Sequence, residues 1–296
     1  MKATALILLL LLATSASAES PDFYEHWGDG RAEISSYRVI QPRYGEPREG
    51  YGVLIFVTED INRETFIKVE SPTPKEDRIY VLKLNKVLKF ATGIYDYSVM
   101  TSVFSAVEGL QRREPFELSK ITLSAQEWCG HVFDEVQVRE GRLKGHINSY
   151  FESEGRHPYE LDAPEDLESE DHLLIRIREL KGPIMREGDE RELTMLPSLW
   201  SHRMQHRPHA LVSGTLRKGR AETVEVGGEP IEAIPWSWSR QDFEKTVWVE
   251  QPYPHRILRW EDSTGDRGEL IKTVREPYWS LKRNTDQKLR KELGIE

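Results

Sequence analysis

The chain has 296 residues, with 50 acidic and 41 basic side chains, so its formal net charge is −9. A hydrophobic fraction of 38% and an aromatic fraction of 9% exclude a disordered chain, which would lack the apolar surface to offset its conformational entropy. The acidic balance disfavours a nucleic-acid-binding protein, and the single cysteine excludes an intramolecular disulfide and a cysteine-based zinc site. Composition therefore predicts a globular protein and leaves its reaction open.

The N-terminus has the pattern of a secretory signal peptide. A positive start precedes an uninterrupted apolar run over residues 5–13, and Ala16 and Ala18 provide the small residues of a cleavage site. The run is shorter than the ~20 residues that span a bilayer. No cysteine lies near the cleavage point, and no later segment has membrane length. We expect residues 1–18 to be removed and residues 19–296 to form a periplasmic or secreted protein without a lipid anchor.

The segment 19–296 is predicted to form a single β-rich domain. Short runs of alternating apolar and polar residues, separated by Gly, Pro and Asp turns, predict an N-terminal antiparallel meander over residues 30–152. Residues 53–57 are apolar on both phases, so this strand is expected to be covered on both faces. The sequence at residues 140–142 is typical of a hairpin turn. A second meander is predicted over residues 211–276, with strands at roughly ten-residue spacing.

Residues 153–210 interrupt this pattern with a predicted helix and a connector. Asp162 or Asp166 is expected to cap a helix over about residues 166–180, because its acidic first turn suits the positive end of a helix dipole. Gly182 and the proline that follows it are expected to end this helix.

The order of these elements predicts a mainly β fold. We expect an antiparallel curved sheet or open half-barrel built from the two meanders, with the central helix packed on its concave side. A short charged helix from Asp286 to Leu293 is expected to lie on the surface at the end of the chain.

Six short segments carry a resemblance to a known group of proteins. They are residues 24–30 (YEHWGDG), 41–45 (QPRYG), 55–59 (IFVTE), 93–98 (GIYDYS), 126–131 (QEWCGH) and 252–257 (PYPHRI). With these segments, nearly the whole chain resembles an uncharacterised family of secreted or lipoprotein-type bacterial envelope proteins. Many members have a lipid-anchored cysteine at the N-terminus, from which this sequence departs. The layout is also similar to the curved half-barrel of periplasmic lipoprotein carriers, which implies a lipid-binding concavity by analogy.

The segment 121–138 contains the first candidates for chemistry. Apolar side chains occupy odd positions in its first part and even positions in its second part. If the strand is straight, three polar side chains share the interior face: Glu127, Cys129 and His131. If a bulge lies near residues 126–128, the same side chains face outward.

Two roles are open for these residues. Cys129 would be a thiolate nucleophile assisted by His131, with Glu127 orienting the imidazole. Side chains two apart on one strand lie side by side, which is poor geometry for this role, and a lone cysteine is usually a small buried hydrophobic residue. The alternative is ligand binding without chemistry, for which the candidates are Trp128, His131, Tyr95 and Tyr97.

Histidines occur at positions 202, 206 and 209. On a helix, His202 and His206 would share a face and could hold zinc, but Pro208 ends such a helix before His209. The glutamate of an HExxH motif is absent. We therefore expect a solvated basic loop here, and we predict neither a metal nor a cofactor.

Tryptophans are frequent in the second meander. Trp236 and Trp238 share one strand face, and Trp248 would lie opposite them across a hairpin. They are expected to pack a half-buried sheet. The alternative, an aromatic wall for a lipid or carbohydrate, requires a concave and exposed surface.

The leading functional hypothesis is a non-enzymatic periplasmic or secreted protein that binds a hydrophobic or lipid-like ligand or assists envelope assembly. The signal peptide, the two meanders around one helix and the absence of a recognisable catalytic motif support it. One alternative is a periplasmic hydrolase that uses Cys129 and His131, or a metal on the histidines of residues 202–209. Another is a structural envelope protein that recruits a partner protein at a sheet edge. Neither a nucleic-acid partner nor a transmembrane segment is expected.

Overall fold

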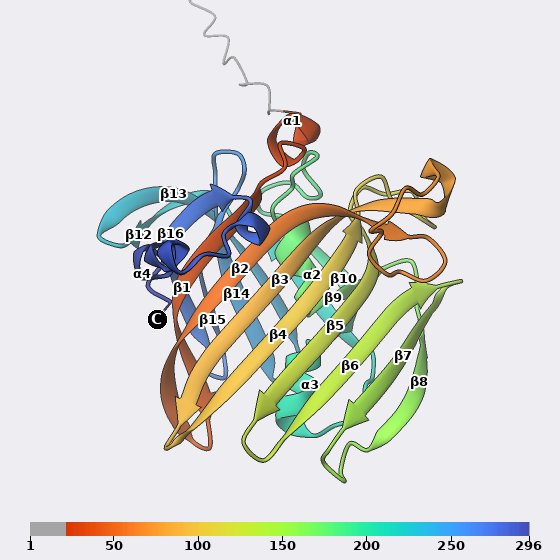
Figure 1. The fold of residues 1–296 in the computed structure, drawn as a ribbon, viewed down its shortest axis with the longest axis horizontal. Helices are drawn as coiled ribbons and strands as arrows, with labels where there is room; N and C mark the ends of the chain where they lie inside the picture. Colours follow the sequence, from red (N-terminus) through yellow and green to blue (C-terminus); the bar gives the residue numbers. More distant parts are fainter. Residues whose placement is uncertain (1–21, 296) are drawn as a thin grey trace, which may run out of the picture.

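The computed structural model describes residues 22–295, so the predicted signal peptide over residues 1–18 lies outside the described residues. Within that range, the first half of the chain forms a short helix and a meander of eight strands (Figure 1). These are α1 (Phe23–Trp27), β1 (Ala32–Arg43), β2 (Glu46–Asn62), β3 (Arg78–Thr92), β4 (Tyr95–Ala106), β5 (Glu117–Glu127), β6 (Gly130–Arg139), β7 (Arg142–Ser149) and β8 (Arg156–Asp162). The predicted N-terminal meander is confirmed, and β8 extends it beyond the predicted boundary at residue 152.

Two sequence predictions about this meander are confirmed. Glu140 and Gly141, between β6 and β7, have positive φ angles of 53° and 73°, which match the twist of a tight hairpin. Residues 53–57, which are apolar on both phases, lie in β2, and this part of the strand is covered on both faces. Its even residues, including Leu54, belong to the main core, whereas Val53 and Val57 pack in a second core on the opposite face.

The second half of the chain adds eight strands and three helices. The strands are β9 (Leu167–Ser169), β10 (Glu190–Leu196), β11 (Val212–Lys218), β12 (Glu222–Val226), β13 (Glu229–Arg240), β14 (Phe243–Glu250), β15 (Ile257–Asp262) and β16 (Arg267–Glu276). The helices are α2 (Glu170–Arg176), α3 (Leu199–Gln205) and α4 (Lys288–Glu292). Single 3-10 turns are η1 (Lys75–Asp77), η2 (Tyr278–Ser280) and η3 (Asn284–Gln287).

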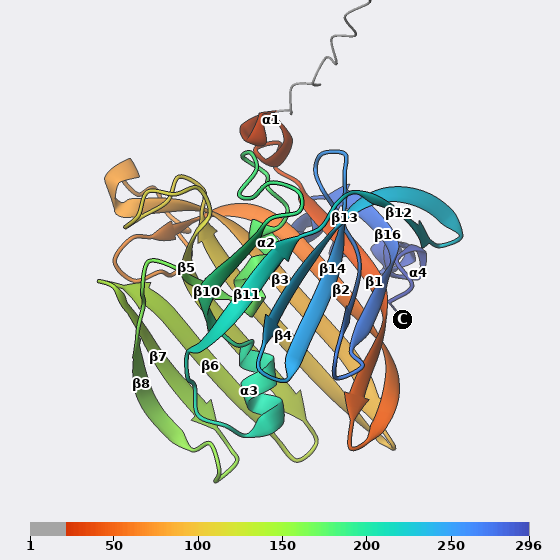
Figure 2. The same cartoon turned by 180° about the vertical axis from the view of Figure 1, so that it is seen from behind.

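All these strands belong to one sheet, because β1 pairs with β16 and so joins the two meanders. The order is β8-β7-β6-β5-β4-β3-β2-β1-β16-β15-β14-β13-β11-β10-β9, with β12 paired to β13 off this path. Figures 1 and 2 show the two halves of the sheet curving around α2 and α3. The structure confirms a mainly β fold with one large curved, open sheet.

The central helix is shorter than predicted. Ser169 caps it by accepting a hydrogen bond from the backbone N–H of Asp171, so neither Asp162 nor Asp166 is the cap. The preceding three residues form β9, which pairs in parallel with β10. Asp166 instead accepts a hydrogen bond from the N–H of Thr194 on β10. The residues whose sequence pattern predicts the first turn of the helix therefore form a paired strand instead.

The sequence does not predict one inner helix, whereas the C-terminal helix lies on the surface as predicted. A second inner helix, α3, begins after Ser198, whose side chain accepts a hydrogen bond from the N–H of Trp200. The predicted C-terminal helix is present as η3 and α4. No residue within α4 is buried, and only Leu293 and Ile295 at its end are buried, against the outer side of β1 and β2. This helix covers apolar side chains that would otherwise face water.

One buried ion pair holds the interior to the sheet. Arg178, just after α2, is paired with Glu33 on β1, with Nη1–Oε1 and Nη2–Oε2 distances of 2.7 and 2.9 Å. The two side chains are 0% and 2% exposed. The guanidinium also donates to the carbonyl oxygens of Pro254 and His255 and lies 4.3 Å from the ring centroid of Phe56. This one side chain thus links the inner connector to both meanders.

Replacing the buried carboxylate should be costly. Glu33→Gln leaves the Arg178 charge buried without a counter-ion, so we expect the free energy of unfolding to fall by about 3–5 kcal/mol. The matched control is Glu190→Gln, since Glu190 forms an exposed pair with Arg217, and its effect should stay below about 1 kcal/mol. Urea unfolding of both variants measures the difference. Equal losses would contradict a special role for the buried pair.

Candidate functional site

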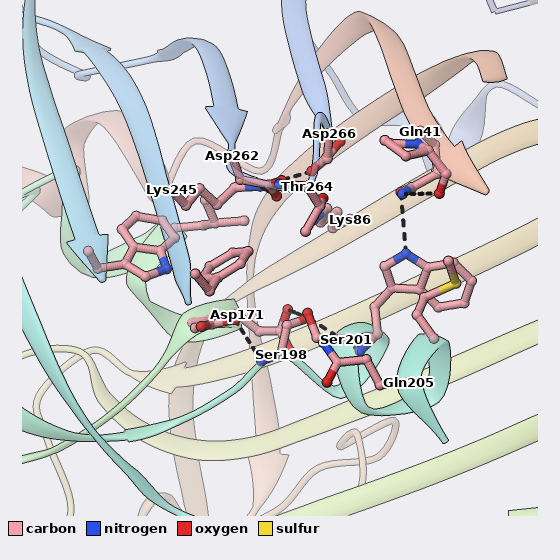
Figure 3. A pocket seen from close by; sticks show the side chains of 17 residues that line it. Gln41, Lys86, Asp171, Ser198, Ser201, Gln205, Lys245, Asp262, Thr264 and Asp266 are labelled. Carbon is pink, nitrogen blue, oxygen red and sulfur yellow. Dashed lines mark hydrogen bonds and ion pairs between the residues drawn. The ribbon is translucent and has the colours of Figure 1, made fainter. Parts of the chain in front are cut away.

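A cavity of about 190 Å³ lies inside the half-barrel, between β1, β3, the two inner helices and the strands β13 to β16 (Figure 3). It is larger than the roughly 10–15 Å³ that one water needs. It is smaller than the roughly 300–1000 Å³ of sites for drug-sized ligands. Apolar side chains form much of its wall: Leu174, Trp200, Met204, Trp238 and Phe243.

The two acidic residues that α2 contributes to this cavity are occupied with structural contacts. Asp171 accepts hydrogen bonds from Ser198 Oγ (2.9 Å) and Leu199 N (3.0 Å) at the start of α3. Glu170 accepts from Ser198 N (3.0 Å) and pairs with Arg240 Nε (2.6 Å). These carboxylates therefore fix α3 in place beside the cavity.

A second group of charges on the opposite wall is also satisfied (Figure 3). Lys245 Nζ lies 2.9 Å from Asp266 and 3.3 Å from Asp262. Burial alone would lower the pKa of Lys245, but the two carboxylates outweigh it and raise that pKa. Burial would raise the pKa of Asp266, but the charges of Lys245 and Lys86 and the hydrogen bonds from Lys245 and Trp260 lower it. This triplet remains charged and internally paired.

Two donors at the cavity have no acceptor. Lys86 on β3 lines the cavity (Figure 3) and makes no hydrogen bond or ion pair within residues 22–295. Burial and the nearby charge of Lys245 lower the pKa of its ammonium group. Trp238 Nε1 is buried and has no hydrogen-bond partner in the same part of the chain. An unmet buried donor costs free energy, so the cavity favours a ligand that brings an acceptor to Lys86 or to Trp238.

A signal for Lys86 is present in the sequence. It occupies the inward phase of β3, between Leu84 and Leu88, which both belong to the main core. A lysine in an otherwise apolar inward row marks a position that needs a polar partner.

The structure rejects both alternatives for the segment 121–138. β5 ends at Glu127 and β6 begins at Gly130, which pair directly, so Trp128 and Cys129 form a two-residue hairpin turn. The apolar phase changes because the chain reverses direction, and neither a straight strand nor a bulge is present at this point.

Glu127, Cys129 and His131 do not form a nucleophilic site. Cys129 is exposed at the turn, and its N–H donates to Glu127 Oε2 at 2.6 Å. A side-chain hydrogen bond to Glu127 and the negative charge of that residue raise the pKa of the Cys129 thiol. A thiolate nucleophile needs the opposite shift. His131 is exposed and pairs with Gln126 across the hairpin.

Three of the four predicted ligand-binding side chains do meet. The ring of Tyr95 lies 6.4 Å from that of Trp128 and 5.9 Å from that of Tyr97, measured between centroids. Tyr97 in turn meets Trp200, which lines the cavity, edge to face at 6.4 Å. These four rings form an aromatic path from the exposed Trp128 to the cavity. His131 makes no ring contact with it among the described residues.

The tryptophans of the second meander are mostly packed. Trp236 and Trp238 are 0% and 1% exposed and belong to the main core. Trp248 pairs with Pro235, so it lies on the opposite face of the sheet from Trp236, and its Nε1 donates to Glu222. The expected packed arrangement holds, and Trp238 alone of the three lines the cavity.

The histidine segment is not a solvated loop throughout. His202 lies in α3, His206 caps its C-terminus with a φ of 52°, and His209 follows. The His209 ring is 6% exposed, stacks on Tyr159 at 4.2 Å and approaches Asp134 to 2.7 Å. Within residues 22–295, no group of three or more His, Cys, Asp or Glu residues is placed to hold a metal ion.

A buried network that the sequence did not indicate has the composition of a catalytic triad. Ser105 Oγ lies 2.8 Å from His172 Nε2, and His172 Nδ1 lies 3.4 Å from Glu168. Ser105 is 0% exposed and donates to the carbonyl oxygen of Phe116 instead of toward the imidazole. A substrate has no access to this hydroxyl, so the network serves to hold α2 against the sheet.

Comparison with protein-family models, with curated proteins and with solved structures found no match to this chain. Within the described residues, no helix combines the length and apolar character needed to cross a membrane. The geometry of the cavity and of the aromatic path therefore carries the functional argument.

The buried network predicts a pH dependence of stability. Burial opposes ionisation of Glu168, but the contact with His172 (Nδ1–Oε2, 3.4 Å) and the charge of Arg176 outweigh it and lower its pKa from 4.5 to about 2. Because the folded-state pKa is depressed, this carboxylate stabilises the fold above pH 4.5 and ceases to do so as the pH falls through about 2. Glu168→Gln should be less stable than wild type at neutral pH by roughly 3 kcal/mol.

Urea unfolding across this range tests that assignment, and the gap between wild type and Glu168→Gln should close at low pH. The exposed Glu64→Gln is the control and should follow the wild type at every pH. A gap that is independent of pH would contradict the proposed ionisation of Glu168.

The exposed thiol gives a second prediction. Because Glu127 raises the pKa of Cys129, Glu127→Gln should increase its thiolate fraction and its rate of alkylation by iodoacetamide near neutral pH. Cys129 is the only cysteine, so the rate reports this residue alone. A rate unchanged from that of the distant Glu64→Gln control would show that Glu127 does not act on the thiol.

Proposed function

We propose that this protein is a non-enzymatic binding protein whose cavity takes a small amphipathic acid. The observation that carries the proposal is the Lys86 ammonium, which lines a cavity whose other charges are paired and which has no hydrogen bond or ion pair of its own within residues 22–295. A ligand carboxylate would pair with the Lys86 ammonium and supply the acceptor that it lacks among residues 22–295. The apolar wall formed by Leu174, Trp200, Met204, Trp238 and Phe243 suits the short apolar part of such a ligand.

This proposal deepens the hypothesis of a hydrophobic or lipid-like ligand. The volume of about 190 Å³ favours a short chain or a small apolar group over a full-length lipid. The signal-peptide pattern of residues 1–18 supports a periplasmic or secreted location for this activity. Handling such a ligand outside the cytoplasm is compatible with a role in envelope assembly.

The competing functions receive less support from the structure. The raised pKa of the Cys129 thiol and its exposed position disfavour a hydrolase built on that residue. The exposed edge strand β8 contains Pro158 and the charged residues Arg156 and Glu160, which protect an edge from pairing with another chain. Recruitment of a partner protein at this edge is therefore the weaker alternative.

The test uses two ligands that differ only in the polar head, octanoate and octanol. Octanoate should bind more tightly, because only its carboxylate pairs with the Lys86 ammonium. Lys86→Met should weaken octanoate binding by roughly tenfold and leave octanol unchanged. The control is Lys89→Met on the same strand, where Lys89 bonds to Ser98. Isothermal titration calorimetry measures each affinity.

The pH dependence adds a second criterion. Ammonium binds the acid, and the pKa of Lys86 lies below its ordinary value of 10.5, so affinity for octanoate should fall as the pH rises through that lowered pKa. Failure of wild type to bind octanoate, together with an organic extract of the purified protein that contains no acid by mass spectrometry, would overturn the proposal.

A further inference from the structure

One end of the sheet presents a large apolar side chain at each of four hairpin connections. We call these residues the tip row: Tyr44 between β1 and β2, Ile94 between β3 and β4, Trp128 between β5 and β6, and Tyr150 after β7. They are 60%, 85%, 69% and 71% exposed, respectively. In an antiparallel meander, alternate turns lie at the same end, which is the lower edge in Figure 1. Isolated exposed apolar residues are ordinary, but four at one end form a surface with a common direction.

A basic group lies among these side chains. Arg43 donates to the hydroxyl oxygens of Tyr97 (3.3 Å) and Tyr44 (3.2 Å), and its guanidinium lies 4.1 Å from the ring centroid of Tyr44. The two hydroxyls are 3.1 Å apart. Among residues 22–295, Arg43 forms no ion pair with a carboxylate, although the chain as a whole is acidic. A positive charge with free donors is therefore available beside the tip row.

We propose that the tip row docks on the surface of a phospholipid bilayer, with Arg43 and the neighbouring tyrosine hydroxyls holding a lipid phosphate. Tyrosine and tryptophan favour the boundary between headgroups and acyl chains, because each has an apolar ring and a polar group. A planar guanidinium with several donors suits the oxygens of a phosphate. The four side chains of the tip row protrude separately, and the fluid surface of a bilayer can close around each of them.

The tip row is continuous with the cavity. Trp128 begins the aromatic path through Tyr95 and Tyr97 to Trp200, and Trp200 lines the cavity. Docking would thus place the exposed start of this path against lipid. Delivery of a lipid-derived acid to the cavity rests on the proposed function, whereas docking itself does not.

Flotation of the full chain with vesicles of phosphatidylethanolamine and phosphatidylglycerol tests the docking surface. We expect wild type to float with the vesicles, and the double variant Ile94→Ser/Trp128→Ser to lose about tenfold or more in partitioning. The matched control is Ile67→Ser/Trp279→Ser. It removes residues that are 65% and 43% exposed at the other end of the sheet, and it should float like the wild type. Circular dichroism checks that both variants fold.

Arg43→Gln separates the phosphate contact from the apolar contact. It should weaken flotation with phospholipid vesicles and leave unchanged the weaker flotation with vesicles of uncharged galactolipid, which carry no phosphate. Wild type that fails to float with phospholipid, an equal loss in the control variant, or an equal loss for Arg43→Gln on both vesicles would overturn the proposal. Octanoate titration without vesicles should be normal in Arg43→Gln and in Ile67→Ser/Trp279→Ser, which change neither the cavity wall nor the aromatic path, so a failure of the cavity proposal would be seen separately.

Discussion

The buried pairing of Arg178 with Glu33 is the interaction on which the interior depends. A guanidinium removed from water costs several kcal/mol unless both its charge and its donors are met. Here the carboxylate of β1 meets the charge, and the carbonyl oxygens of Pro254 and His255 in the second meander meet further donors. The requirement is satisfied only when the chain after α2 lies at one place between the two halves of the sheet. The position of α2 follows from it.

The position of α2 then determines the cavity. Glu170 and Asp171 in its first turn hold the N-terminus of α3, and α3 places Trp200 between the aromatic path and the cavity. The charges around the cavity are met in pairs or triplets, except at Lys86. Because the other charges that line the cavity have partners among residues 22–295, the Lys86 ammonium is the feature that a ligand would complete. The buried ion pair thus positions α2 and α3, and Trp200 on α3 joins the cavity to the aromatic path that leads to the tip row.

The fold could be predicted because strand alternation is local. The alternation of apolar and polar residues predicts the strands of the second meander. It also predicts that residues 53–57 of β2 are covered on both faces. The prediction was wrong where long-range pairing competes with local pattern. Leu167 and its neighbours follow a helical pattern, yet they pair with β10, because this pairing satisfies backbone groups of β10 that would otherwise be unpaired at the edge of the sheet. The change of phase near Cys129 was ambiguous for a related reason, since a two-residue turn and a bulge alter the alternation in the same way.

The sequence by itself determined the antiparallel β class, the two meanders and the aromatic segments around Tyr95 and Trp128, because each depends on residues close together in the chain. Only the tertiary structure decided which polar groups meet. Glu33 and Arg178 lie far apart in sequence. Lys86 is also far in sequence from Asp262 and Asp266, which form ion pairs with Lys245. The partner of a buried charge is set by how the sheet curves, which no local pattern encodes. For that reason the sequence pointed to Cys129, whereas the tertiary structure places the candidate site at the cavity beside Lys86.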